Sequence, residues 1–247
     1  MRQKKCDPCT EQPIWLGRSE CRSCSNLHKV LFSNLSDDDL RTVVQGICEP
    51  IDQFSYSKGS VLYQEGDVDN AIYTIRSGLV KLVRYLPDGR ERIIRLMKAT
   101  ESIGLERVLG RPYGHTAVVL KNVTACRIPI DVLQQLDEEK PRFYRKMMER
   151  WATTLFQADD YIMLLLSGTV KQRVVHLIQW LSEYTQSKNK STVELLSGSD
   201  MSAMLNITVE SVSRSLAEMK RLNIIRHTHG ESYEYSKKDL LHYADKP

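Results

Sequence analysis

Six cysteines are the residues of this sequence whose spacing points to chemistry, and four of them fall within the first 24 residues. Those four form two Cys-x2-Cys pairs, Cys6 with Cys9 and Cys21 with Cys24, while Cys126 stands far along the chain. Thiolates spaced in this way bind metal or carry redox chemistry. Because no apolar export signal precedes them, we expect a cytoplasmic protein without structural disulfides.

The composition is that of a globular chain. Its 247 residues are 41% hydrophobic and 27% charged, which excludes disorder and allows one large domain or two modest ones. The longest apolar run, residues 162–166, is too short to cross a membrane, so no membrane association is expected. A formal net charge of +4 permits a polyanionic partner but does not require one.

Residues 51–132 predict an antiparallel sandwich or jelly roll. Short β-rich runs at residues 60–63, 72–75, 79–83, 92–96 and 116–120 alternate with turn signals. One such signal is Ser77-Gly78. Another is Pro87-Asp88-Gly89, which predicts a hairpin turn because proline fixes one backbone angle and glycine accepts a positive φ.

A helical period follows from residue 131 to about residue 166. Six apolar positions step by three and four, as in a heptad seam: Met148, Trp151, Leu155, Ala158, Ile162 and Leu165. No neighbouring helix of equal length is available to cover this seam, so we predict a homodimer, with packing against the chain's own sandwich as the alternative. Asp159 lies beside the seam, where two copies would oppose two carboxylates and weaken association.

The remaining residues predict a winged helix-turn-helix. An amphipathic helix at residues 170–184 precedes a short helix and tight turn within residues 195–208, a longer helix from Val209 to about Leu222, and a hairpin around Gly230. The second helix of such a motif reads the major groove of DNA with its N-terminal residues.

The longer helix carries the side chains that suit this task. Thr208 is a natural N-cap, and the first exposed turns would present Glu210, Ser213 and Arg214. Arginine binds guanine through two hydrogen bonds, glutamate accepts from cytosine, and serine contacts base or phosphate. Lys220 and Arg221 suit phosphates. The predicted core-facing residues are Val209, Val212 and Leu216; an ordinary amphipathic helix with a solvated polar face is the alternative.

Residues 204–214 resemble the recognition helix of the CRP/FNR superfamily of bacterial transcription regulators, and the resemblance covers almost the whole chain. Residues 65–78 are similar to the family's sensor jelly roll, and residues 160–167 to the end of its dimerisation helix. The Glu-x-x-Ser-Arg pattern resembles the FNR branch, which implies that Glu210, Ser213 and Arg214 read a palindromic TTGAT-type site. Asn206 replaces the glycine usual in the turn, but asparagine also tolerates the left-handed conformation.

The resemblance implies an α+β fold in four parts. These are a cysteine-rich arm at residues 1–30, a β jelly-roll sensor domain of the cyclic-nucleotide-binding type at residues 31–135, a dimerisation helix at residues 136–167, and a winged helix-turn-helix domain at residues 168–247. RNA polymerase is the second partner that the resemblance implies.

The FNR branch holds an oxygen-labile 4Fe–4S cluster, which the resemblance extends to this chain. Cys21, Cys24 and Cys126 match the family's ligands. The family's third N-terminal cysteine would fall near Val30, which cannot ligate iron, so Cys6 or Cys9 would supply the fourth thiolate. An acid at the position of Asp159 keeps the cluster-free form monomeric in FNR, and the resemblance implies that oxygen abolishes DNA binding here.

Other functions stay open at this point. The two Cys-x2-Cys pairs alone would make a tetrahedral zinc site, and the cysteines could also be a thiol switch. Cyclic nucleotide fits less well, because Gly104-Leu105-Glu106 displaces the family's acid by one residue and His115 replaces its phosphate-binding arginine. A CxxC thiol oxidoreductase would need a βαβ context that the sequence lacks, so no enzyme is expected. Cys48 is interpreted as structural.

Overall fold

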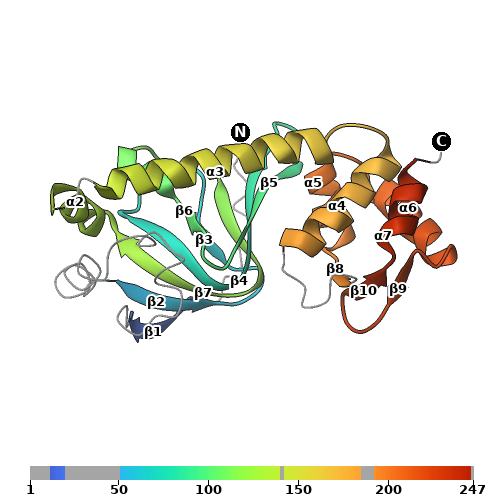
Figure 1. Ribbon diagram of the computed structural model, residues 1–247. Helices are drawn as coiled ribbons and strands as arrows, with labels where there is room; N and C mark the ends of the chain where they lie inside the picture. Colours follow the sequence, from blue (N-terminus) through green and yellow to red (C-terminus); the bar gives the residue numbers. More distant parts are fainter. Residues whose placement is uncertain (1–11, 20–50, 140–141, 185–191, 246–247) are drawn as a thin grey trace. The chain divides into compact units, whose positions relative to one another are not determined.

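The computed structural model describes residues 12–19, 51–139, 142–184 and 192–245 (Figure 1). They fall into two compact units, which are described separately. One unit combines the N-terminal residues up to residue 84 with residues 94–151, and the other combines residues 85–93 with the C-terminal part from residue 152. None of the helices in the described ranges is long and apolar enough to span a membrane.

The part of the chain predicted to be the sensor domain, called the sensor half below, is built on a seven-stranded sheet. Its strand order is β1-β2-β7-β4-β5, with β3 also beside β7 and β6 beside β4. β7 pairs antiparallel with β2, β3 and β4, and β1 lies at the open edge next to β2 (Figure 1). The strands are β1 (Ile14–Arg18), β2 (Asp52–Tyr56), β3 (Val61–Tyr63), β4 (Ala71–Tyr85), β5 (Glu91–Lys98), β6 (Ser102–Ile103) and β7 (Thr116–Pro129).

The predicted fold class, an antiparallel β sensor domain with helices and a C-terminal helix-turn-helix, is confirmed. The predicted hairpin turn is also present, because the backbone N–H of Leu86 donates to the carbonyl of Arg90 at 2.9 Å across Pro87-Asp88-Gly89. Alternate residues of the central strands fill the core of the sheet, among them Ile75 and Val80 of β4 and Ala125 of β7.

The turn predicted at Ser77-Gly78 is wrong, because β4 runs straight through both residues. The register between β4 and β7 shifts on either side of Ser77, and Gly78 has φ +91°. A Cβ atom on Gly78 would lie 2.2 Å from the carbonyl oxygen of Asn122. The glycine therefore marks a bulge with a close backbone approach instead of a chain reversal. The fifth predicted strand is likewise longer than expected and extends to Pro129.

Three helical segments follow parts of the sheet. A short 3-10 helix, η3 (Leu105–Leu109), lies between β6 and β7, and β7 leads directly into α2 (Ile130–Glu139). The long helix α3 (Arg142–Leu165) comes next. The single helical stretch predicted from residue 131 is thus two helices, and the sequence has Pro141 just before the second, consistent with the exclusion of proline from helix interiors.

The C-terminal part packs helices against a three-stranded sheet of order β8-β10-β9 (Figure 1). The amphipathic residues predicted in α4 are all fully buried there: Val174, Val175, Leu177, Ile178 and Leu181. The elements are α4 (Val170–Tyr184), β8 (Thr192–Glu194), α5 (Gly198–Leu205), α6 (Val209–Arg221), β9 (Ile225–His227), β10 (Ser232–Tyr235) and α7 (Lys237–Ala244).

Replacing Gly78 with alanine is expected to destabilise the sensor half. The positive φ alone costs about 1–3 kcal/mol in the free energy of unfolding, and the contact with the Asn122 carbonyl adds to this. Gly89, with φ +83° and nothing within 4 Å of its Cβ position, is the matched control. Thermal or urea unfolding should show a larger loss for Gly78→Ala than for Gly89→Ala. Equal losses would contradict the close approach.

Candidate functional site

The turn between α5 and α6 is held by a chain of local hydrogen bonds. Asn206 adopts the left-handed conformation, with φ 55° and ψ 45°, and its backbone N–H donates to the carbonyl of Ser202. The Ser202 hydroxyl in turn donates to the carbonyl of Ile207 at 2.6 Å. Thr208 then caps α6, because its Oγ1 accepts from the backbone N–H of Ser211 at 3.2 Å. The roles predicted for Asn206 and Thr208 are confirmed.

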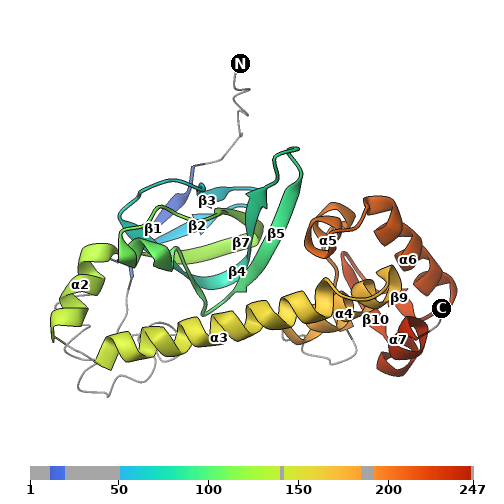
Figure 2. The ribbon, with the colours of Figure 1, turned by 90° about the horizontal axis from the view of Figure 1, so that it is seen from above.

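Helix α6 follows α5 in the C-terminal part (Figure 2), and the polar side chains of its first turns are exposed. Glu210, Ser213 and Arg214 are all exposed, whereas Val212 and Met219 are fully buried. The prediction that Val209 faces the core is wrong, since its side chain is 42% exposed. The buried stripe of α6 consists instead of Val212, Ser215 and Met219, with Leu216 half-buried beside it.

Glu210 and Arg214 pair an acceptor with a donor on this exposed face. The pKa of Glu210 lies below its ordinary value, first because its carboxylate accepts from its own backbone N–H, and also because Thr208 donates to it and Arg214 is near. Glu210 is therefore ionised at neutral pH and can only accept hydrogen bonds. Acceptor and donor side chains one helical turn apart are suited to the edges of a G·C pair.

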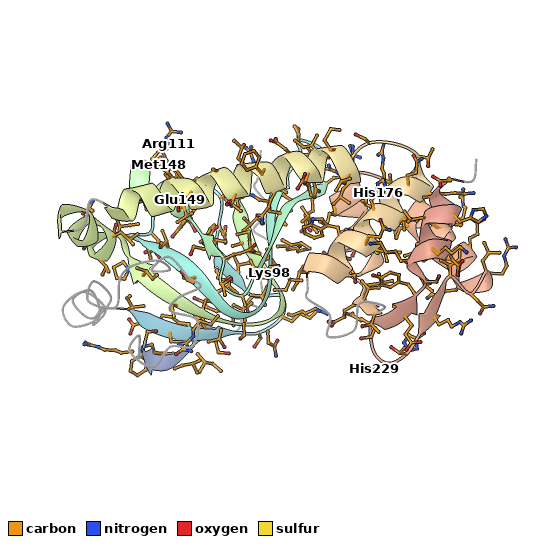
Figure 3. The ribbon with its side chains drawn as sticks, viewed as in Figure 1. Lys98, Arg111, Met148, Glu149, His176 and His229 are labelled. Carbon is orange, nitrogen blue, oxygen red and sulfur yellow. The ribbon has the colours of Figure 1, made fainter. Side chains whose placement is uncertain are left out.

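Lys220 has a second role that the sequence did not indicate. Its ammonium group donates to the hydroxyl of Tyr233 at 3.1 Å and lies 4.9 Å from the centre of that ring. The ring of His227 packs edge-on against the same tyrosine, with ring centres 5.3 Å apart. Lys220 thus joins the end of α6 to the β9–β10 hairpin, and His229 lies in the loop of that hairpin (Figure 3).

Cys126 lies on the middle strand of the sensor sheet. It pairs with Gln53 of β2 and with Thr74 of β4, and Gln53 pairs in turn with Gly17 of β1. Its neighbour Ala125 belongs to the core, so the Cys126 side chain points to the opposite face of the sheet. The residue is buried, with 9% of its surface exposed.

The N-terminal strand reaches this sulfur through Ser19. The Ser19 hydroxyl lies 3.3 Å from the Cys126 sulfur, and the Ser19 backbone N–H donates to the carbonyl of Ile51 at 2.7 Å. Trp15 holds the same strand by donating from Nε1 to the Asp52 carboxylate at 3.0 Å.

The other predicted ligands lie outside the described residues: Cys6, Cys9, Cys21 and Cys24, together with the cysteine interpreted as structural, Cys48. Within the ranges that the structure describes, no three His, Cys, Asp or Glu side chains are close enough to hold a metal ion. Cys126 is therefore the one predicted ligand whose surroundings are known.

His115 occupies the position where the cyclic-nucleotide branch has arginine. It is buried, and its Nδ1 lies 3.4 Å from the Glu106 carboxylate, which also accepts from the backbone N–H of Gly114 at 2.9 Å. Burial lowers the pKa of His115, and the nearby Glu106 carboxylate only opposes this shift. The imidazole is thus neutral at pH 7 and is not a permanent cation for a phosphate.

Helix α3 divides the predicted seam between two faces. Met148, which Figure 3 labels on this helix, is 64% exposed, Leu155 is 64% exposed and Ile162 is 55% exposed. Leu165 is fully buried, so its predicted place in a dimer interface is wrong: its side chain is used within its own chain. Trp151 and Ala158 are half-buried.

The exposed apolar strip of α3 includes more residues than the predicted seam. Phe156 and Met163 are also largely exposed, and both lie on the side of α3 away from Leu165. At about 3.6 residues per turn, the exposed Asp159 falls between Leu155 and Met163 on the helix surface. The acid therefore lies in the exposed strip and borders the seam residue Leu155; that it opposes its own copy in a dimer stays a prediction.

Comparison with known proteins matches both halves of the chain to families. The cyclic nucleotide-binding domain family matches residues 53–140, and the Crp-like helix-turn-helix domain family matches residues 172–241. The chain belongs to the CRP/FNR superfamily. A cyclic nucleotide-binding domain thus precedes a helix-turn-helix domain of the kind that binds DNA.

Two curated relatives illustrate this place in the CRP/FNR superfamily. The anaerobic regulatory protein of Pasteurella multocida is 26% identical over 171 residues, which are 68% of this chain and 63% of that protein. The transcriptional activator protein anr of Pseudomonas aeruginosa is 26% identical over 216 residues, 85% of this chain and 86% of that protein. Both names describe regulators and not enzymes.

One solved structure shows the same CRP/FNR fold. FixK2 from Bradyrhizobium japonicum superimposes with a TM-score of 0.69 at 22% identity, covering 79% of this chain and 98% of that one. This likeness concerns the fold alone.

Proposed function

We propose that this protein is an oxygen-responsive transcription regulator that binds a palindromic TTGAT-type DNA site as a homodimer. In this proposal a 4Fe–4S cluster held by its cysteines keeps the dimer competent, and exposure to oxygen releases the DNA. The single observation that carries the DNA-binding part is the capped helix α6 with Glu210, Ser213 and Arg214 exposed on its first turns.

In this proposal each of the three exposed side chains makes a different contact with a DNA half-site. Arg214 donates two hydrogen bonds to the guanine of TTGAT, and Glu210, held ionised by its own backbone N–H and Thr208, accepts from a cytosine amino group. Ser213 contacts a base or phosphate between them. Because Lys220 is bound to Tyr233, it holds the hairpin in place beside α6, while the exposed Arg221 contacts phosphate.

The exposed strip of α3 is the proposed dimer interface. The apolar side chains of Met148, Leu155 and Ile162 are exposed to water, and burying them is energetically favourable. In a two-fold symmetric dimer the strip would be buried against the same strip of the second copy. Asp159 lies within this strip, so dimerisation brings two carboxylates into a partly dry interface. This repulsion weakens the dimer, so that binding or loss of the cluster can control dimerisation.

The cysteines of the arm and Cys126 suit an iron–sulfur cluster. Cys126 is buried, its sulfur lies on the face of the sheet that Ser19 reaches, and the chain runs from Ser19 directly into Cys21 and Cys24. Cys6 or Cys9 would complete four thiolates. When bound, the cluster supplies an oxygen-reactive centre; the protein supplies the sulfurs and the buried strand that positions one of them. RNA polymerase in the cytoplasm is the further partner of this proposal.

Replacing Arg214 with alanine is expected to remove discrimination at the guanine of each half-site. The loss is about 1–3 kcal/mol per half-site, measured as the affinity ratio between a TTGAT palindrome and the same duplex with each such guanine changed to adenine. Arg221→Ala is the control: a lost phosphate contact weakens binding to both duplexes alike. Equal weakening on both duplexes by Arg214→Ala would contradict its reading role.

Anaerobic purification is expected to give a brown protein whose colour bleaches in air, with about four iron and four sulfide per chain. Cys126→Ser should lose the colour, and Cys6→Ser and Cys9→Ser, made separately, identify the fourth ligand. Cys48→Ser is the matched control and should retain the cluster. Visible absorption with iron, sulfide and zinc analysis is the measurement. Colourless protein with one zinc per chain, unaffected by Cys126→Ser, would establish the zinc site in its place.

A further inference from the structure

Tyr161 places one buried hydroxyl against two backbone carbonyls. The side chain comes from α3, and its oxygen lies 2.8 Å from the carbonyl oxygen of Ile93 and 2.5 Å from that of Met204. All three residues belong to the second compact unit, which includes residues 85–93 at the tip of the β4–β5 hairpin. A residue of α3 thus contacts the start of β5 and the end of α5 together.

Both carbonyl groups lie where regular secondary structure leaves carbonyls without a backbone partner. Met204 lies in the last turn of α5, where carbonyls have no partner within the helix. Ile93 lies on β5, which ends the strand order of the sheet and so has a neighbouring strand on one side only in the described sheet. A tyrosine hydroxyl carries a single hydrogen, so it cannot donate fully to both carbonyls.

The Tyr161 hydroxyl stays protonated and can therefore donate a hydrogen bond. Tyr161 is buried, and burial raises its pKa to about 12, although Arg92 opposes the shift. It therefore keeps its proton throughout the physiological range. Its bond to Met204 also lies two residues before Asn206, the residue whose left-handed conformation turns the chain into α6. Loosening that bond releases the helix end from which the recognition helix starts.

We propose that Tyr161 is a positioning residue that couples the β4–β5 hairpin to the helix-turn-helix by sharing its one proton between Ile93 and Met204. A shift of the hairpin that strengthens one of these hydrogen bonds weakens the other, and the orientation of α6 responds. By reciprocity, DNA bound to α6 must also alter the hairpin. The inference does not depend on the cluster or on any other ligand of the sensor half.

The test is Tyr161→Phe, which keeps the ring and removes the hydroxyl, followed by amide hydrogen exchange with and without operator DNA. In the wild type, DNA is expected to change exchange both in residues 86–96 and in residues 200–210. In Tyr161→Phe the change in residues 86–96 should disappear while that in residues 200–210 remains, and operator affinity should fall about 2- to 12-fold.

Tyr235→Phe is the matched control, because it also removes one tyrosine hydroxyl from the same unit, where that hydroxyl donates to Ser182 Oγ at 2.8 Å. It should keep the response of residues 86–96 to DNA. The proposal is overturned if wild-type residues 86–96 do not respond to DNA, if Tyr161→Phe retains the response, or if Tyr235→Phe loses it equally. If a variant fails to fold, the absence of a response to DNA in wild-type residues 86–96 still overturns the proposal.

Discussion

Helix α3 has one face buried within its own chain and another face exposed, and the position of α6 depends on what each face contacts. Tyr161 and Leu165 are buried within their own chain, whereas Met148, Leu155 and Ile162 on another face of the same helix remain exposed. An apolar strip of this length is stable in water only when something covers it. The buried face fixes α3 to the helix-turn-helix, so whatever covers the exposed face also determines where α6 is presented.

The same division explains what the sequence could and could not predict. The cap at Thr208, the left-handed Asn206 and the hairpin turn at residues 87–89 follow from local chemistry, and the structure contains all of them. A heptad pattern, by contrast, gives the spacing of apolar residues but not which of them the chain uses for itself. Leu165 has the spacing of the seam, yet the chain buries it for itself.

Two further differences have the same physical origin in long-range packing. Gly78 carries the signal of a turn, but the reason for glycine there is the carbonyl of Asn122 on a strand more than forty residues later. Val209 has the spacing of a core residue, yet it lies in the first turn of α6 beside Gly198, which has no side chain; a Cβ atom added to Gly198 would lie 3.6 Å from Val209 Cγ1. The contact between Ser19 and Cys126 could not be predicted either, because it requires β1 to be paired at the sheet edge.

The central claim is that the state of the cysteines controls whether α3 pairs with its copy. Sedimentation equilibrium of anaerobically prepared protein, before and after exposure to air, tests it most directly. We predict about twice the mass of one chain before exposure and the mass of one chain after it, with Asp159→Ala remaining dimeric in both conditions. A wild-type protein whose mass is the same before and after exposure would contradict the account.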